Sequence, residues 1–167
     1  FSYKKNTLND ALMPSEGSLL RFTSNIGTPV GDYKYYQLEG FQKSYFPLNE
    51  DWIFKINNRL NYGSGYANDH LPLFKRYFEG GSSSVRGFDF NSLGAKYANG
   101  KPKGGELTFL SSLGVSRDMS PVGVENKNIR FIGFVDAGAI SEKISDFEFD
   151  DIRVSSGFGI DWLTPIG

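Results

Sequence analysis

The chain has 167 residues, and its 18 lysines and arginines against 19 aspartates and glutamates leave a formal net charge of −1. This length suggests one domain, and the near-neutral charge gives no support for a nucleic-acid partner, which normally shows as a basic surplus. The absence of cysteine excludes disulfides and thiolate sites, and the single histidine argues against a multi-histidine metal site or a Ser-His-Asp triad. We therefore expect no metal and no cofactor. Since no run of about 18 apolar residues occurs, the sequence predicts no transmembrane helix.

Aromatic residues make up 16% of the chain, and there are 20 glycines. Aromatic and β-branched side chains suit a pleated sheet, and glycine supplies turns and bulges, so this composition predicts an all-β fold. Apolar and polar residues alternate repeatedly along the chain, and each stretch of alternation marks a strand. The pattern predicts seven strands, at Phe1–Leu8, Ser18–Gly27, Tyr33–Phe46, Trp52–Tyr62, Glu106–Ser116, Asn128–Ile140 and Ile152–Trp162.

The alternation fits two architectures, which differ in what covers the apolar face. In the segment Trp52–Tyr62, for example, Phe54 and Leu60 share one face, and Lys55 and Arg59 share the other. In a soluble sandwich the apolar face forms the core, whereas in a membrane barrel it meets lipid and the polar face lines the lumen. The charged and amide residues on the polar faces, and strand lengths of about 10 to 15 residues, favour the barrel. The sequence thus predicts an antiparallel transmembrane β-barrel segment, with a soluble sandwich as the open alternative.

The predicted connections differ between the two ends of the strands. Short or Pro/Gly-containing turns are expected at Met13–Ser18, Pro47–Asp51 and Ser120–Asn126. The opposite end holds the long segment from about Ala67 to Gly105, the acidic segment Ser141–Asp151 and the short turn Thr28–Asp32. Outer-membrane barrels have short periplasmic turns and longer extracellular loops, and long connections are usually functional or disordered. The long segment is therefore the first place to search for a functional site.

Within this long segment, Gly80 and Gly81 begin a Gly-Gly-Ser-Ser-Ser stretch that leads to the tip Val85-Arg86-Gly87-Phe88. One interpretation is a mobile surface loop with a glycine hinge. The other is a loop that folds back into a lumen, where Arg86 meets a carboxylate, because a buried guanidinium needs an acceptor that matches its fork. The pattern supplies a candidate acceptor in Asp136, which lies on the polar face of a later strand.

Further motifs accompany the loop, and together they indicate a family. The loop continues to Asn91-Ser92-Leu93-Gly94, Phe134-Val135-Asp136-Ala137-Gly138 follows later, and the chain closes with Ser156–Gly167. An early Pro14-x-x-Gly17 turn is also present. With these residues the chain resembles the BamA family of the bacterial surface antigen superfamily, and the resemblance covers essentially its whole length. The Val-Arg-Gly-Phe core is shared across the superfamily, whereas the Gly-Gly-Ser-Ser-Ser lead-in and the Asn-Ser-Leu-Gly sequel favour BamA.

The resemblance implies roles for particular residues. It implies that Arg86 is held inside the barrel by acidic residues, of which Asp136 is one. A second family acid lies on the preceding strand, where this chain has Gly114. Three possibilities stay open: Arg86 has one carboxylate, Glu106 or Glu79 compensates, or the register differs from this alignment.

The resemblance also implies a function and a larger protein. BamA proteins fold and insert β-barrel proteins into the outer membrane, so we expect a non-enzymatic barrel segment located there. The implied partners are lipoprotein subunits of the assembly complex, unfolded outer-membrane proteins and outer-membrane lipid. A full family barrel has sixteen strands preceded by POTRA domains, so residues 1–167 are expected to form a partial barrel. Two alternatives remain open, a TamA-like or two-partner secretion pore of the same superfamily and a soluble all-β binding module.

Overall fold

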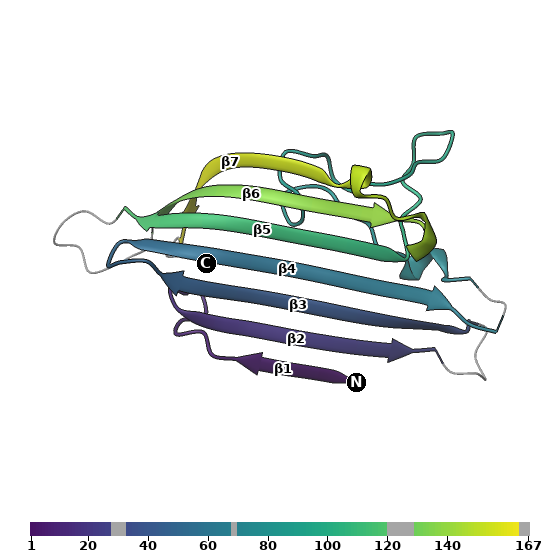
Figure 1. Ribbon diagram of the computed structural model, residues 1–167, viewed down its shortest axis with the longest axis horizontal. Coiled ribbons are helices and arrows are strands. Elements are labelled where there is room, and N and C mark those ends of the chain that lie inside the picture. The colour runs from purple at the N-terminus through teal and green to yellow at the C-terminus, as the bar shows by residue number, and fades with distance from the viewer. Residues whose placement is uncertain (28–32, 68–69, 120–128, 164–167) are drawn as a thin grey trace.

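The computed structural model describes residues 1–27, 33–67, 70–119 and 129–163, and these residues form one antiparallel sheet (Figure 1). The sheet has seven strands, and each strand pairs with its neighbour in sequence. The strands are β1 (Ser2–Asn6), β2 (Gly17–Ile26), β3 (Tyr35–Pro47), β4 (Trp52–Gly65), β5 (Leu107–Asp118), β6 (Ile129–Ser141) and β7 (Arg153–Trp162). Three short 3-10 helices lie in the connections: η1 (Leu73–Lys75), η2 (Ile144–Asp146) and η3 (Phe149–Asp151). The predicted antiparallel all-β fold is confirmed.

Two of the strand boundaries that differ from the predicted ones have a local reason. β1 ends at Asn6 instead of Leu8, because the Asn6 side chain accepts the Leu8 backbone N–H at 3.1 Å and turns the chain. β4 continues past Tyr62 to Gly65, because Tyr35 on β3 provides a pairing partner for Gly65. The predicted turns Thr28–Asp32 and Ser120–Asn126 lie outside the described residues.

The sheet exposes its apolar face and buries polar side chains on its other face, which is the opposite of the arrangement in a soluble protein. Many apolar side chains of the outer face are open, with exposed fractions of 80% for Phe158, 66% for Ile160 and 56% for Leu60. On the concave face, Thr108 and Asp136 are fully buried. A soluble sandwich would bury the aromatic stripes in a core, whereas a barrel wall presents them to lipid, so this exposure favours the outer face as the surface that meets lipid. In the described part of the chain, no helix is long and apolar enough to span a membrane.

The concave face of β5 and β6 is covered by the long connection between β4 and β5. Its residues Val85 and Leu93 pack with Leu110 of β5 and Ile140 of β6 in a small apolar core, with exposed fractions of 6% or less. A backbone bridge between Tyr77 and Gly105 closes the base of this loop. The predicted long connection is thus an inward-folded element and not a mobile surface loop.

Candidate functional site: the loop arginine on the inner wall

Asp136 lies midway along β6 and points into the concave face. In the strand pairing it is opposite Ser112 of β5 and Ser155 of β7, so both neighbours in the wall are small hydroxyl residues. The carboxylate side chain is 1% exposed. A buried carboxylate needs charge-assisted hydrogen bonds, because an unpaired charge in such a place is costly.

Arg86 supplies these hydrogen bonds from the loop. Its Nε donates to Asp136 Oδ2 at 2.7 Å and its Nη2 donates to Oδ1 at 2.7 Å, which is the two-pronged geometry of an arginine–carboxylate pair. The Arg86 backbone N–H also donates to Oδ2, at 3.1 Å. The contact therefore fixes both the side chain and the main chain of the loop tip, and it joins residues 50 positions apart.

Two further residues, Ser112 and Phe134, complete the contact, and the sequence predicted no role at the site for either of them. The Ser112 hydroxyl donates to Asp136 Oδ1 at 2.6 Å and accepts from Arg86 Nη2 at 3.1 Å. The Phe134 ring lies under the guanidinium, with its centroid 3.3 Å from Arg86 Cζ, and this is a cation–π contact. The register of the sheet is the signal that identifies Ser112, since alternation places both Ser112 and Asp136 on polar faces and the pairing puts them opposite each other.

The other predicted loop residues lie close to this contact but act through packing. Val85 is 1% exposed in the apolar core, and Phe88 packs against that core. Gly80 and Gly81 are buried with φ of 121° and 97°, values that disfavour other residues. A Cβ on Gly80 would lie 2.5 Å from the Asp89 carbonyl oxygen, so Gly80 is packed against the chain that returns over it. Gly87 also has a positive φ, of 87°.

The expected position of the second acid is clarified by the register. Gly114 pairs with Phe134, whereas Ser112 is the β5 residue opposite Asp136. Among the described residues, neither Glu79 nor Glu106 forms an ion pair with Arg86, so Asp136 is its single carboxylate partner there. Burial raises the pKa of the Glu79 carboxyl, and its surroundings are the loop turn and the wall beside Thr108.

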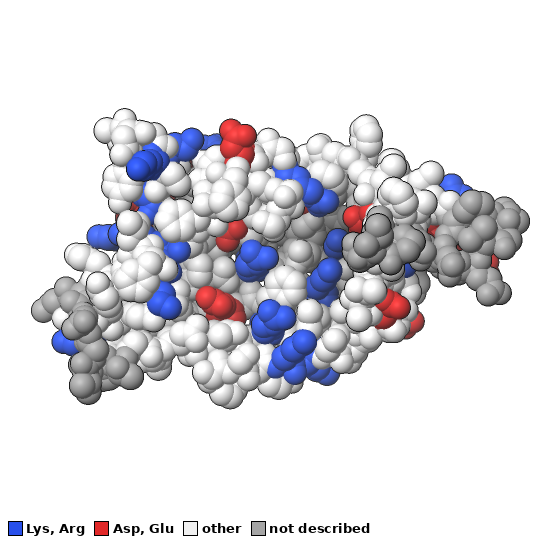
Figure 2. Space-filling model, turned by 180° about the vertical axis from the view of Figure 1, so that it is seen from behind, with Lys and Arg blue, Asp and Glu red and all other residues white. Residues whose placement is uncertain are grey.

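Basic side chains gather over the middle of the concave face around a hollow, as Figure 2 shows from behind the sheet. A cavity of about 680 Å³ lies there, and Arg21, Lys43 and Arg59 are among its lining residues. Arg21 and Arg59 both stack on the ring of Phe41, at 5.9 and 6.0 Å from its centroid. This polar, charged interior is the property expected of a barrel lumen.

Comparison with known proteins identifies the superfamily. The sequence matches the Omp85 superfamily domain over residues 1–167. The chain belongs to the Omp85 superfamily. A curated relative is the outer membrane protein assembly factor BamA of Neisseria meningitidis serogroup B (strain MC58), 24% identical over 193 residues that cover 98% of this chain. A solved structure, BamA from Haemophilus ducreyi lacking POTRA domains 1–3, matches with a TM-score of 0.88 and 24% identity over 98% of this chain.

This Omp85 chain spans 24% of the Neisseria protein's length and 36% of the Haemophilus chain. Membership confirms the predicted outer-membrane location and the barrel class of the fold. The predicted resemblance to BamA is likewise confirmed, because the curated relative and the solved structure are both BamA proteins.

Proposed function

We propose that this chain is a barrel segment of a factor that folds and inserts β-barrel proteins into the outer membrane. Membership of the Omp85 superfamily and similarity to BamA support an outer-membrane insertion factor. The observation that carries the proposal is the Arg86–Asp136 contact, which holds the long loop against the inner wall. In this role the chain provides barrel wall and a fixed lumenal loop and catalyses no reaction.

We further propose that insertion uses no ATP. The energy would come from the substrate, which buries apolar area in lipid and pairs its backbone groups as its strands form. The factor's contribution would be to offer a membrane-embedded wall and strand edges for pairing. The partners in this proposal are unfolded outer-membrane proteins, the lipoprotein subunits of the assembly complex and the surrounding lipid.

The proposal treats residues 1–167 as part of a larger barrel. Among the described strands, β1 and β7 each have a single neighbour, so each offers an unpaired edge. An open edge of this length would be a template for pairing with other chains if it stayed uncovered. We propose that further strands of the full-length protein continue the sheet from both edges.

The experiment that tests the function reconstitutes the full-length protein into lipid vesicles. A urea-unfolded outer-membrane barrel protein is added without nucleotide, and its folding is followed by heat-modifiability and protease protection. Faster folding than in empty vesicles supports the proposal. Equal rates would contradict it, and transport of a polypeptide into the vesicle interior would instead favour the alternative of a translocation pore.

A further inference from the structure

The turn between β1 and β2, Thr7–Glu16, folds over the concave face at the end of the sheet opposite the long loop. Its residues Met13 and Pro14 line a small cavity of about 40 Å³ together with inward residues of β3 to β7, among them Tyr45 of β3 and Asp161 of β7. Pro14 is buried. A turn that served only to connect β1 and β2 would not need to contact β6, which lies four strands away from β2 in the sheet.

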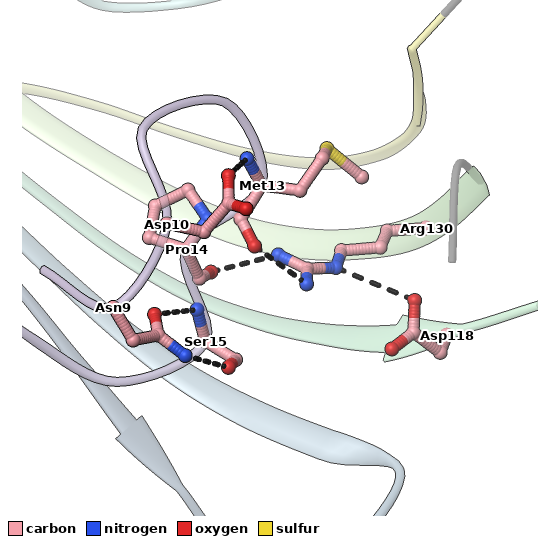
Figure 3. Close-up of polar contacts among 7 residues, drawn as sticks. All are labelled: Asn9, Asp10, Met13, Pro14, Ser15, Asp118 and Arg130. Atoms are coloured by element: carbon pink, nitrogen blue, oxygen red, sulfur yellow. Dashed lines mark hydrogen bonds and ion pairs between the residues drawn. The ribbon is translucent and has the colours of Figure 1, made fainter. Parts of the chain in front are cut away.

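The turn is held in shape by its own side chains (Figure 3). Asp10 Oδ1 accepts the backbone N–H groups of Leu12 and Met13 at 2.7 and 2.8 Å. Asn9 closes the neck, because its amide donates to Ser15 Oγ at 2.8 Å and accepts the Ser15 N–H at 3.0 Å. The backbone N–H groups of Met13 and Leu12 hold the pKa of the Asp10 carboxyl below its usual value.

Arg130, near the start of β6, contacts this preformed turn (Figure 3). Its Nη1 donates to the Pro14 carbonyl at 2.7 Å, and its Nη2 donates to the Met13 carbonyl at 2.9 Å. Its Nε faces Asp118 Oδ1 of β5 at 3.4 Å. The Arg130 side chain is only 8% exposed, and the Asp118 carboxylate compensates its charge. The two Nη groups of its guanidinium face carbonyls of a segment 116 positions earlier in the chain.

This arrangement makes particular use of arginine. The guanidinium presents five N–H donors in a rigid plane and can serve two carbonyls and one carboxylate together. A lysine ammonium would keep the charge but could not hold the same three acceptors in that plane. Arg130 lies six residues before Asp136, roughly 20 Å along the strand, so β6 holds the turn near one end of the lumen and the long loop near the middle.

We propose that the β1–β2 turn is a plug for the short-turn mouth of the lumen and that Arg130 is the positioning residue that holds it in place. The turn covers the part of the mouth that β3 to β7 border, and the species it would exclude are water and small ions. This inference concerns the barrel itself and does not depend on the assembly activity.

The first test uses a cysteine pair, since residues 1–167 contain no cysteine. Met13 and Ile132 line the same small cavity, so M13C with I132C in the full-length protein, without other cysteines, should be joined by a short bifunctional thiol-reactive cross-linker. The control pair is E50C with I132C, because Glu50 lies in the exposed β3–β4 turn and does not line that cavity. Failure of the Met13 pair to cross-link in folded, heat-modifiable protein would overturn the proposal.

The second test measures ion conductance of the full-length protein in planar bilayers. In R130M the fraction of time in a high-conductance state should rise about tenfold or more, because hydrogen bonds to a charged group are lost. R130K should lie between R130M and the unchanged protein. A turn in which residues 9–14 are replaced by two glycines removes the plug while leaving Arg130, and it should conduct at least as much as R130M.

Heat-modifiability shows that each variant is folded, and protease sensitivity of the long loop should stay unchanged in all of them. Equal conductance in the shortened-turn variant and the unchanged protein would overturn the proposal. Conductance that rises only together with loss of heat-modifiability or exposure of the long loop would also overturn it, since Arg130 would then act on general stability alone.

Discussion

Ser112 and Asp136 lie directly opposite each other in the β5–β6 pairing, and the serine hydroxyl joins the aspartate to the arginine of the loop. The Asp136 carboxylate thus accepts one hydrogen bond from the wall itself, from Ser112. Arg86 adds three more, two from its guanidinium and one from its backbone N–H. Because these groups come from β5, β6 and the loop, the contact forms only when the loop is folded against the wall. The predictions below test this coupling.

Removal of the Arg86 side chain should release the loop. Arg86→Ala leaves the Asp136 carboxylate buried without its cation, and breaking such a pair costs about 3 kcal/mol. We expect faster protease cleavage in the loop and a lower temperature for loss of heat-modifiability. Arg117→Ala is the matched control, since its ion pair with Asp51 is half exposed and such pairs contribute about 0–1 kcal/mol. Equal behaviour of the two variants would contradict the anchoring role of Arg86.

Ser112→Ala should weaken the same contact without abolishing it. It removes a donor to Asp136 Oδ1 and an acceptor for Arg86, at a cost of about 1 kcal/mol. In a double-mutant cycle with Arg86→Ala, the two effects should be clearly non-additive, because the residues share one hydrogen-bond network. Ser111→Ala is the control, since Ser111 donates to Asn58 and not to Asp136. Additive effects would show that Ser112 acts independently of Arg86.

The close approach of the loop to the wall at Gly138 should be sensitive to one methyl group. A Cβ at Gly138 would lie 2.5 Å from Val85 Cγ2 and 2.6 Å from Leu110 Cδ2, so Gly138→Ala should destabilise the docked loop by about 1–3 kcal/mol. Adding Val85→Ala removes one of these clashing atoms and should recover part of the loss in loop protection. Gly133→Ala on the same strand, where a Cβ meets nothing within 4 Å, should be neutral.

Loop protection should decrease as the pH rises, owing to Glu79. Burial raises the pKa of this carboxyl above its usual value, although Arg59 and the hydroxyls of Ser84 and Thr108 act in the opposite direction. The folded state therefore binds more protons than the unfolded state between the usual and the raised pKa. The contribution of Glu79 is complete below the usual carboxyl pKa and is lost as the pH rises through the raised one.

Glu79→Gln should remove this component from the profile of protease protection against pH. Glu50→Gln, in an exposed turn, should leave the profile unchanged. A Glu79→Gln profile that superimposes on that of the unchanged protein would contradict the prediction.

A lysine on the outer face should cost more than a lysine on the concave face. Phe158 points outward from β7 and is 80% exposed, so Phe158→Lys puts a charge into lipid at about 2–4 kcal/mol near the middle of the bilayer. Thr23→Lys on β2 enters the lumenal cavity and should have a small effect. Urea unfolding of the full-length barrel in lipid vesicles measures both. Equal losses would argue against lipid contact at Phe158.

The sequence alone was sufficient for the strands, the class of fold and the loop that holds the site. Alternation has a period of two in any strand, so β2 to β7 could be placed nearly to their ends, and the apolar face could be assigned on all of them except β3, whose two faces are mixed. Val-Arg-Gly-Phe and the Asp136 segment also carry a family resemblance that membership of the Omp85 superfamily confirms. Alternation could not decide between lipid and a packed core as the cover of that apolar face, because both are apolar surroundings.

Tertiary structure decided which residues meet. Ser112, not Gly114, lies beside Asp136, because register depends on the pairing of whole strands and a shift of two residues preserves the faces while changing every partner. Gly80 is packed because Asp89 and Ser92 fold back onto it, and Gly81 lies against Phe90, contacts with no local signal. The turn of Met13 and Pro14 reaches Arg130 through the curvature of the sheet, and periodicity within single strands contains no information about that curvature.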